Sequence, residues 1–501
     1  MPEPRVARAG CCGTRISRRQ LLAASAAASL ARPSRTATPA IVRQPPVRRP
    51  LRVQPVLVYQ IYKPREQASW RPWGGLMAEG DVAAEKERIN KELAQIRSAA
   101  DFPVEILGLE AATSASETAA IAGRDYDVGL MYAASGPVQA YEAMNVPGKW
   151  NLMFVRHRSG PVYLWYEVAH PRYLRKTVDE FGEPGMDWQD VVVDSLDELV
   201  WRLRGLAGLK NTLGKRIVCV GGAGGWGKGG QQAPYLAERV WKFELVTVPY
   251  EELGARIEAA RRDETLVSRA HAEADRYLRQ RGVRLETDAE FVRNAFVLHE
   301  VFHGLLAQAG TDAITIHQCM GTIMPVSRTT ACLPLTLLND DGYLAFCESD
   351  FVVIPAGVLL HYVSGKPVFL NNPTYPHHGV VTQAHCTAPR KMDGERLEPV
   401  RILTHFESDY GAAPKVEMRK GQVITNLIPD FRARRWMGFE GEILDSPFLP
   451  ICRSQIDVRV KGDCDKLAAQ MRGFHWMTCY GSYLREVGYA LKKVGIEWLV
   501  V

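Results

Sequence analysis

The stretch RIVCVGGAGGWGKGGQQAPYLAERVWKFELVTV, residues 216–248, contains the pattern that decides the fold class. An apolar run at 216–220 is followed by a glycine-rich loop, a helix-forming segment and a second apolar run at 244–248. A strand, a crossover helix and a second strand of this kind form a βαβ unit, whose two strands are parallel. The sequence therefore predicts an α/β protein built on a parallel sheet.

The same alternation continues on both sides of this unit. Four upstream segments predict a first layered α/β domain over residues 51–190. A helix at 288–309 and a strand at 313–316 extend a second α/β domain over residues 191–350. The four upstream segments are strands at 55–61, 104–107 and 126–132 and a helix at 78–99.

From Val368 onward, short strand-like runs are separated by Gly, Pro and Asn, a spacing that is typical of an antiparallel barrel or sandwich. We expect a β-rich C-terminal domain, containing an antiparallel barrel, over residues 351–501. A final helix at 482–493 and a strand at 496–501 are predicted to close the chain. The clearest strand-like runs are 380–384, 401–405, 422–427 and 456–460.

Residues 1–50 differ in composition from the rest of the chain. They hold ten Arg and one acid, a net charge of +9 against +6 for the whole chain, which leaves about −3 on residues 51–501. That balance disfavours nucleic-acid binding, which needs a basic face on the folded part. The segment SRRQLL (residues 17–22) precedes an Ala-rich apolar run and resembles a twin-arginine export signal. We therefore expect an exported, periplasmic protein; a basic disordered tail is the alternative.

Two further features of the sequence argue against a membrane span and against a zinc ribbon. The apolar run of the leader is about ten residues long, whereas a membrane span needs about 20, so no stable membrane span is expected. The eight cysteines after the leader are widely spaced, and none forms a CxxC pair, which disfavours a zinc ribbon. Their even number in an exported protein permits disulfides, whose pairing cannot be deduced from spacing.

The glycine-rich loop at 221–230 precedes a helix, where backbone N–H groups could hold an anion. Gly229 follows Lys228 at the position where a Walker loop needs Ser or Thr for the metal. Nucleotide binding is therefore disfavoured, and a flexible connection between strand and helix is the simpler interpretation.

The segment His299-Glu300-Val301-Phe302-His303 matches the HExxH pattern of zinc metallopeptidases. On a helix, the two histidines share a face and can bind zinc, while the glutamate polarises a zinc-bound water. Residues 304–310 supply no third ligand. A zinc metallopeptidase is thus one alternative, and two partly buried histidines in a packed helix are the other.

The last third of the chain contains a series of short polar motifs: LLNDDG (337–342), AFCESD (345–350), GKPVF (365–369), QAHC (383–386), HFES (405–408), GQVIT (421–425), GFHW (473–476) and GIE (495–497). In content and order they resemble the C-terminal region of the L-fucose and L-arabinose isomerase families, over about residues 313–501. Residues 53–290 agree with these families only in general α/β organisation.

The resemblance implies an aldose–ketose isomerase that acts on a small sugar through an enediol, as a homotrimer or homohexamer. It also implies a divalent metal, typically Mn²⁺, which prefers carboxylate, imidazole and water ligands. By position in the motifs, Asp350 and His475 match metal ligands, and Glu348 and His385 are further candidates in the same pocket. Glu348 and Asp350 would also move the proton between the sugar carbons.

One position departs from the family pattern. The family has a catalytic glutamate ahead of the Cys-Glu-x-Asp element, where this chain has His317 and Gln318. Because glutamine cannot act as a general base, a sugar-binding relative without catalysis is another alternative.

Substrate-binding candidates come from both ends of the chain. His385 and Gln318 belong to the motif-rich C-terminal third, and Trp70, Arg71 and Trp73 follow the first strand. Tryptophan faces stack on sugar rings, and arginine donates hydrogen bonds to hydroxyl groups. Packing in the core is the alternative role of the two tryptophans.

Overall fold

The computed structural model describes residues 45, 47–71, 73–163 and 186–501. The predicted export signal at 17–22 lies outside the described residues, as do the two cysteines of the leader. Within the described ranges, no helix combines the length and the apolar character that crossing a membrane requires.

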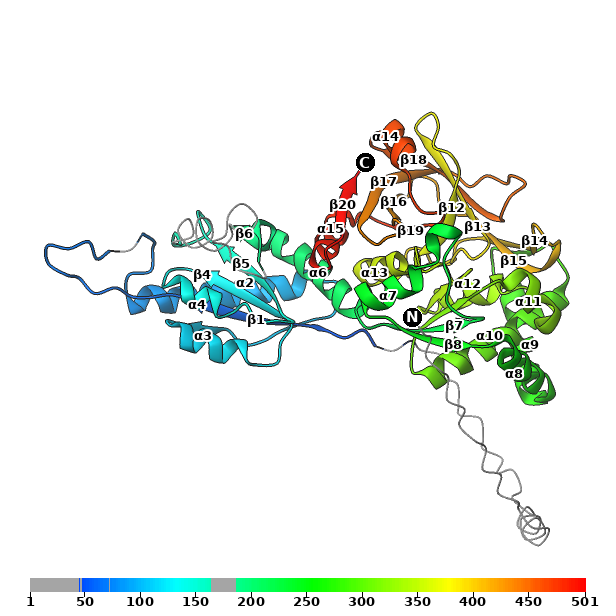
Figure 1. Cartoon of the computed structure of the whole chain (residues 1–501), viewed down its shortest axis with the longest axis horizontal. Helices are drawn as coiled ribbons and strands as arrows, with labels where there is room; N and C mark the ends of the chain where they lie inside the picture. Colours follow the sequence, from blue (N-terminus) through cyan, green and yellow to red (C-terminus); the bar gives the residue numbers. More distant parts are fainter. Residues whose placement is uncertain (1–44, 46, 72, 164–185) are drawn as a thin grey trace, which may run out of the picture. The chain divides into compact units, whose positions relative to one another are not determined.

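The N-terminal part is a parallel sheet with strand order β2-β1-β4-β5-β6, and β3 also pairs with β1 (Figure 1). The central strands are apolar almost throughout and buried, as expected for parallel strands that are covered on both faces. This confirms the first α/β unit. Its elements are β1 (Leu51–Val58), α2 (Glu79–Ala99), β2 (Val104–Ile106), β3 (Glu110–Ala112), α3 (Ala115–Ala122), β4 (Val128–Ala133), α4 (Val138–Glu142), β5 (Trp150–Val155), β6 (Val191–Val193) and α6 (Leu196–Thr212).

The second sheet is also parallel, with strand order β11-β10-β7-β8. The quoted stretch forms β7 and β8, and the chain leaves β7 through Gly221 and Gly222, whose φ values of 75° and 98° favour glycine. The elements are β7 (Arg216–Val220), α7 (Ala233–Trp241), β8 (Glu244–Val248), α8 (Tyr250–Arg262), α9 (Glu264–Leu278), α10 (Ala289–Ala309), β10 (Ala313–Ile316), α11 (Cys319–Ser327), α12 (Cys332–Asp340) and β11 (Leu344–Phe346).

The C-terminal part contains a closed antiparallel barrel of six strands, in the order β16-β19-β12-β13-β18-β17, closed by pairing of β17 with β16. Closure removes the free edges of the sheet. The last strand, β20, pairs in parallel with β17. The elements are α13 (Ile354–Ser364), β12 (Phe369–Pro373), β13 (Val380–His385), β16 (Val423–Ile428), β17 (Arg435–Asp445), β18 (Ser454–Lys461), α14 (Cys464–Gln470), β19 (Trp476–Tyr480), α15 (Leu484–Lys493) and β20 (Glu497–Val500).

One predicted barrel strand lies outside the barrel. The run at 401–405 belongs to β14 (Val400–His405), which forms a separate sheet with β15 (Tyr410–Val416) and β9 (Val283–Leu285). Alternating apolar residues indicate a strand but do not select its partner.

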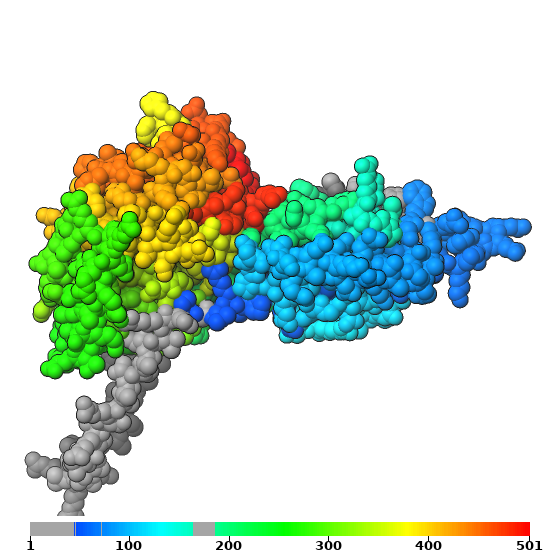
Figure 2. Space-filling model, turned by 180° about the vertical axis from the view of Figure 1, so that it is seen from behind, coloured from blue at the N-terminus to red at the C-terminus, as the bar shows by residue number. Residues whose placement is uncertain are grey.

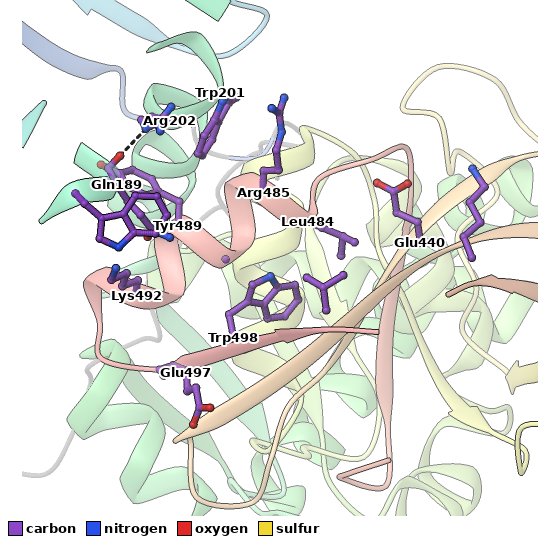
Figure 3. Close-up of a pocket in the computed structure, with 15 residues that line it drawn as sticks. Gln189, Trp201, Arg202, Glu440, Leu484, Arg485, Tyr489, Lys492, Glu497 and Trp498 are labelled. Carbon is purple, nitrogen blue, oxygen red and sulfur yellow. Dashed lines mark hydrogen bonds between the residues drawn. The ribbon is translucent and has the colours of Figure 1, made fainter. Parts of the chain in front are cut away.

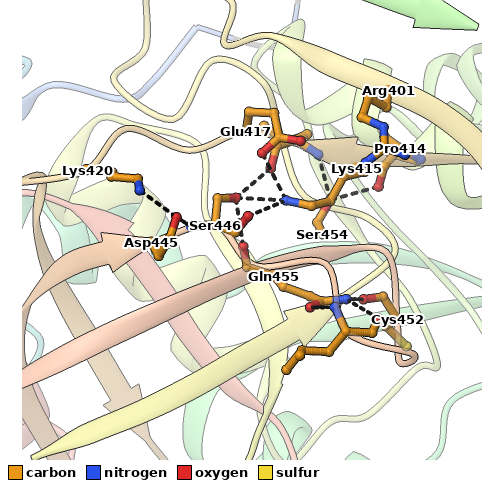
Figure 4. Close-up of polar contacts among 12 residues, drawn as sticks. Arg401, Pro414, Lys415, Glu417, Lys420, Asp445, Ser446, Cys452, Ser454 and Gln455 are labelled. Carbon is orange, nitrogen blue, oxygen red and sulfur yellow. Dashed lines mark hydrogen bonds and ion pairs between the residues drawn. The ribbon is translucent and has the colours of Figure 1, made fainter.

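Polar contacts tie this small sheet to the barrel (Figure 4). The buried Lys415 of β15 donates to Ser446 Oγ at 2.8 Å and pairs with Glu417 at 3.1 Å. Ser454, at the start of β18, donates to the carbonyl of Pro414 at 2.7 Å. The second half of β15 is therefore held against the barrel.

The second α/β unit and the barrel share one hydrophobic core. It includes Val218 and Ile316 from the parallel sheet together with Ile456 and Trp476 from the barrel. In Figure 2, green segments of the second α/β unit and orange segments of the barrel adjoin on the visible surface. Consequently, loops at the carboxyl ends of β7, β10 and β11 meet residues at the ends of barrel strands, an arrangement that commonly forms sites.

Candidate metal centre

Glu348, His385 and His475 converge at this junction, and their ligand-type atoms all lie within 4.8 Å of one another. Glu348 follows β11, His385 ends β13, and His475 immediately precedes β19. Glu348 and the next residue, Ser349, both have positive φ, 64° and 48°. Two successive non-glycine residues in this region are strained, which is typical of functional sites.

The two histidines approach different oxygens of the same carboxylate. Nε2 of His475 lies 3.3 Å from Oε2 of Glu348, and Nε2 of His385 lies 3.5 Å from Oε1. Glu348 Oε2, His385 Nε2 and His475 Nε2 are all buried without a hydrogen-bond partner. Because buried polar atoms are normally satisfied, their convergence fits a cation among them.

The electrostatics of the cluster favour a charged carboxylate. Burial opposes ionisation of Glu348, but the two histidines outweigh it and hold the pKa of Glu348 well below its usual value. Burial alone would lower the pKa of His475, yet contacts with Asp350 and Glu348 raise it to about 9. In the absence of a metal, therefore, a proton on His475 occupies the place of a cation.

Asp350 lies behind His475 and fixes its orientation. Its Oδ2 is 2.8 Å from Nδ1 of His475, and its Oδ1 accepts hydrogen bonds from the backbone N–H groups of Trp226 and Val352 at 3.2 and 3.1 Å. Because Asp350 accepts the hydrogen bond from Nδ1–H of His475, loss of the other ring proton would leave the lone pair on Nε2, where a metal could bind. This is the usual relation between a carboxylate and a metal-binding histidine. That Asp350 is itself a ligand stays a prediction.

The glycine-rich loop after β7 packs against this cluster. Gly224 N donates to the carbonyl of Ser349 at 3.2 Å and forms a bridge with Asp350. A Cβ at Gly224 would come within 2.8 Å of the His317 ring, so any larger residue there would displace that ring. The loop thus contributes to the walls of the candidate metal centre.

Two partly exposed aromatic rings lie beside the cluster. Trp226 stacks on Phe474 with ring centroids 4.2 Å apart and an interplanar angle of 10°. Trp226 also meets His475 edge-on at 5.9 Å. The two rings remain 47% and 38% exposed, so they offer an apolar surface next to the cluster. Sequence reasoning missed both; the Trp within a glycine-rich loop was the available signal.

The remaining predicted substrate residues lie elsewhere or at the margin. Gln318 is exposed and in a left-handed conformation, with φ of 50°. Its neighbour His317 approaches the site instead, with Nδ1 3.4 Å from the carbonyl oxygen of Glu348.

The predicted N-terminal residues do not belong to the cluster. Trp70 and Arg71 line a separate pocket of about 200 Å³ in the first α/β unit, where the Arg71 guanidinium lies 5.2 Å from the Trp70 ring. Trp73 is 66% exposed. Their role in substrate binding stays a prediction.

The HExxH segment forms a second cluster on α10. Nε2 of His299 and Nε2 of His303 are 3.2 Å apart, and Asp341 Oδ2 lies 3.9 Å from His299. Asp341 is the third donor that the residues after 303 did not supply. Glu300 pairs with Arg269 at 2.9 Å. That ion pair occupies the carboxylate that a peptidase needs to activate water.

A third cluster combines Cys332, Cys386 and His405, all buried. The cysteine spacing gave no signal for it, because its members come from the start of a helix and the ends of two strands in different sheets.

A larger pocket, of about 870 Å³, lies away from these clusters (Figure 3). Its lining includes Trp201, Tyr489 and Trp498, with Arg485 and Lys492 among its charged groups. None of the cluster residues lines it. Its volume is therefore no guide to where metal chemistry could occur.

Comparison of the chain with protein-family models and with curated proteins finds no match. The candidate centre consequently rests on its own geometry: one carboxylate and two imidazoles around a common point, with an acidic residue orienting one of them. Carboxylate and imidazole donors suit Mn²⁺, Fe²⁺ and Zn²⁺.

Proposed function

We propose that this protein is a metal-dependent, aldose–ketose isomerase-like enzyme that acts on a small sugar. The observation that carries the proposal is the set of three unsatisfied, buried atoms that Glu348, His385 and His475 direct at one another. Their chemistry suits a divalent ion such as Mn²⁺. The position of the cluster, where loops after parallel strands meet the barrel, agrees with the resemblance to sugar isomerases.

The bound ion would polarise the carbonyl and the neighbouring hydroxyl of an open-chain sugar. Asp350 keeps His475 in the orientation that presents Nε2. The stacked rings of Trp226 and Phe474 offer an apolar face on which the carbon chain of the sugar can rest.

Proton transfer needs a base near the sugar carbons. Asp350 has both oxygens engaged in hydrogen bonds, so we assign the transfer to His317 and Glu348. His317 takes the place of the family's glutamate, and imidazole is the commonest general acid–base group. The His317 imidazole would accept the proton from C2 of an aldose and return it to C1, while Glu348 would carry the hydroxyl proton from O2 to O1. The product is the ketose.

Export through the twin-arginine route and assembly as a homotrimer or homohexamer complete the proposal. Both rest on the leader segment at 17–22 and on the family resemblance. Determination of the mature N-terminus from periplasmic extracts and light scattering of the purified protein test them.

The zinc metallopeptidase remains the second candidate function, because Asp341 gives the two helix histidines a third donor. The ion pair of Glu300 with Arg269 disfavours it. A sugar-binding protein without catalysis is the third candidate, because Gln318 stands beside the position of the family's glutamate.

Metal content of the purified mature protein, measured by plasma mass spectrometry, tests the proposal. The variant is His475→Ala, and the matched control is His299→Ala, which removes an imidazole from the other histidine cluster. Manganese retained by the wild type and the control but lost from His475→Ala supports the proposal. Zinc lost only from His299→Ala overturns it and favours the peptidase.

Activity distinguishes the enzyme from the binding protein. Manganese-loaded protein is incubated with pentoses and deoxyhexoses, and ketose formation is followed. Turnover that falls in His317→Gln supports the assignment of the base. Sugar binding without turnover favours the non-catalytic relative.

A further inference from the structure

We infer that Cys332, Cys386 and His405 form a second, structural metal site that binds Zn²⁺. The sulfur atoms and one imidazole nitrogen lie within 4.8 Å of one another, and all three side chains are buried. This inference does not rest on the proposed isomerase function, because it concerns different donors and a different ion.

The three donors come from three separate elements. Cys332 begins α12, Cys386 directly follows β13, and His405 ends β14. A metal at this point would link the second α/β unit, the barrel and the small three-stranded sheet. A structural metal stabilises a fold most when it links segments that are far apart in the sequence, because it then closes large loops.

The distances are close to those of a tetrahedral zinc site. Zn–S bonds of about 2.3 Å and Zn–N bonds of about 2.0 Å place neighbouring donors roughly 3.7 Å apart in a tetrahedron. The donors of the cluster are within 4.8 Å. A shift of about 1 Å, within reach of side-chain rotation, would therefore bring all three onto one ion.

The nature and charge of the donors select the ion. Thiolates prefer soft or borderline ions over Mn²⁺ and Mg²⁺, which favour oxygen. Two thiolates and a neutral imidazole also cancel the charge of Zn²⁺, so that the buried site would be neutral. Cu⁺ in the same site would leave an uncompensated negative charge, which is costly to bury.

The surroundings favour a metal over simple packing of apolar thiols. Cys332 and Cys386 share a small core cluster only with Ala413, separate from the large hydrophobic cores. A histidine converges on them, and Ser408 Oγ lies 3.4 Å from its Nδ1. Outer contacts of this kind orient ligating imidazoles.

The zinc site would adjoin the candidate manganese centre. Cys386 Sγ lies 3.9 Å from Nδ1 of His385, whose Nε2 faces Glu348. Zinc bound by Cys386 would therefore also restrain the neighbouring histidine.

The test measures zinc per full-length chain after expression with added zinc and purification without chelators. Variants Cys332→Ala and Cys386→Ala are compared with Cys479→Ala, which removes a buried thiol of the barrel outside the cluster. We expect about one zinc ion per chain in the wild type and the control, and at least a tenfold loss in the two variants. Equal zinc in Cys386→Ala overturns the inference.

A second measurement does not depend on folding of the variants. Metal-free wild type is titrated with Co²⁺, and thiolate-to-cobalt charge-transfer absorption is expected in the near ultraviolet at one equivalent. Absence of that absorption overturns the inference, as does a disulfide between Cys332 and Cys386 found by peptide mass spectrometry, or copper in place of zinc. Zinc lost from Glu348→Gln but kept in Cys386→Ala would assign the zinc to the other centre and likewise overturn it.

Discussion

The Glu348 cluster and the Cys332 cluster are neighbours with opposite chemistry. The first offers a carboxylate and two imidazoles beside two partly exposed rings, whereas the second offers two thiols and one imidazole, all buried. A carboxylate and imidazole set with access for a substrate suits a catalytic ion, while a closed, thiol-rich set suits structural zinc. Their location in the fold would not distinguish a proposed catalytic site from a proposed structural one. The type of donor atoms and their exposure distinguish the two.

The largest expected effect is a change in stability with pH that arises beside the Cys332 cluster. Asp340 ends the helix that Cys332 begins, and its Oδ1 accepts hydrogen bonds from the N–H groups of Arg390 and Lys391 at 2.7 and 2.8 Å. It thereby holds the segment that follows Cys386. Burial raises the pKa of Asp340 from 3.8 to about 7, although those N–H groups oppose the shift.

Between about pH 4 and 7, Asp340 is therefore protonated in the folded state and ionised in the unfolded state. The contribution of Asp340 to the free energy of unfolding is fully present below pH 4. It falls as the pH rises to 7, by up to about 4 kcal/mol for three pKa units. Asp340→Asn keeps the accepting oxygen and removes the titration. We expect urea unfolding at pH 4 to 8 to show that the free energy of unfolding of Asp340→Asn increases relative to that of the wild type as the pH rises. A constant difference between the two proteins across this pH range would contradict the prediction.

Independent loading of the two sites is the next test of the comparison. Glu348→Gln removes the only carboxylate of its cluster, and we expect manganese affinity to fall by more than about 100-fold, beyond the usual effect of an outer contact. Zinc content should not change. Calorimetric titration with Mn²⁺ measures the manganese affinity, and plasma mass spectrometry measures the zinc content. A parallel loss of both metals would show that the two clusters act as one.

Asp350→Asn should have a smaller effect on the same centre. The amide can still accept from the backbone of Trp226 and Val352, but its NH₂ group would face Nδ1 of His475. That contact favours the tautomer with a proton on Nε2, which blocks the ligand position. We expect a loss of about 10- to 100-fold in manganese affinity, measured by the same titration. Asp341→Asn, in the histidine cluster of α10, is the control and should retain wild-type affinity.

The smallest effect is expected at the aromatic rings. Trp226→Ala removes the exposed face of the stacked pair, and sugar affinity should fall by about five- to tenfold, the value of roughly one stacking contact. Manganese affinity should be unchanged, because the backbone N–H that Asp350 accepts from remains. Trp226→Phe is the conservative control. Unchanged sugar binding in Trp226→Ala would remove this surface from the binding site.

Much of the fold could be predicted because its segments carry strong local patterns. β7, β8 and β10 have the predicted bounds, since each is a short apolar run flanked by clear breaks. The barrel was predicted from the spacing of its strands. The strand that pairs with β14 could not be predicted, because the alternation of apolar residues within one segment does not specify which distant segment it pairs with.

The candidate site was predicted only in part, for a related reason. Glu348, His385 and His475 belong to recognisable motifs, and the structure brings them together. The role of Asp350 in orienting His475 depends on distances that no motif states. The thiol cluster lay beyond prediction altogether, because its three members are joined only by the folding of three elements onto one another.

The end of β13 has a consequence for how the two centres can change. Side chains alternate between faces along a strand, and the consecutive residues His385 and Cys386 deliver one donor to each centre. The last residue of β13 and the residue directly after it thus serve the two proposed metal centres separately. The double variant His385→Cys/Cys386→His would exchange the two donors, offering a thiol to the carboxylate–imidazole cluster and a second imidazole to the thiol cluster.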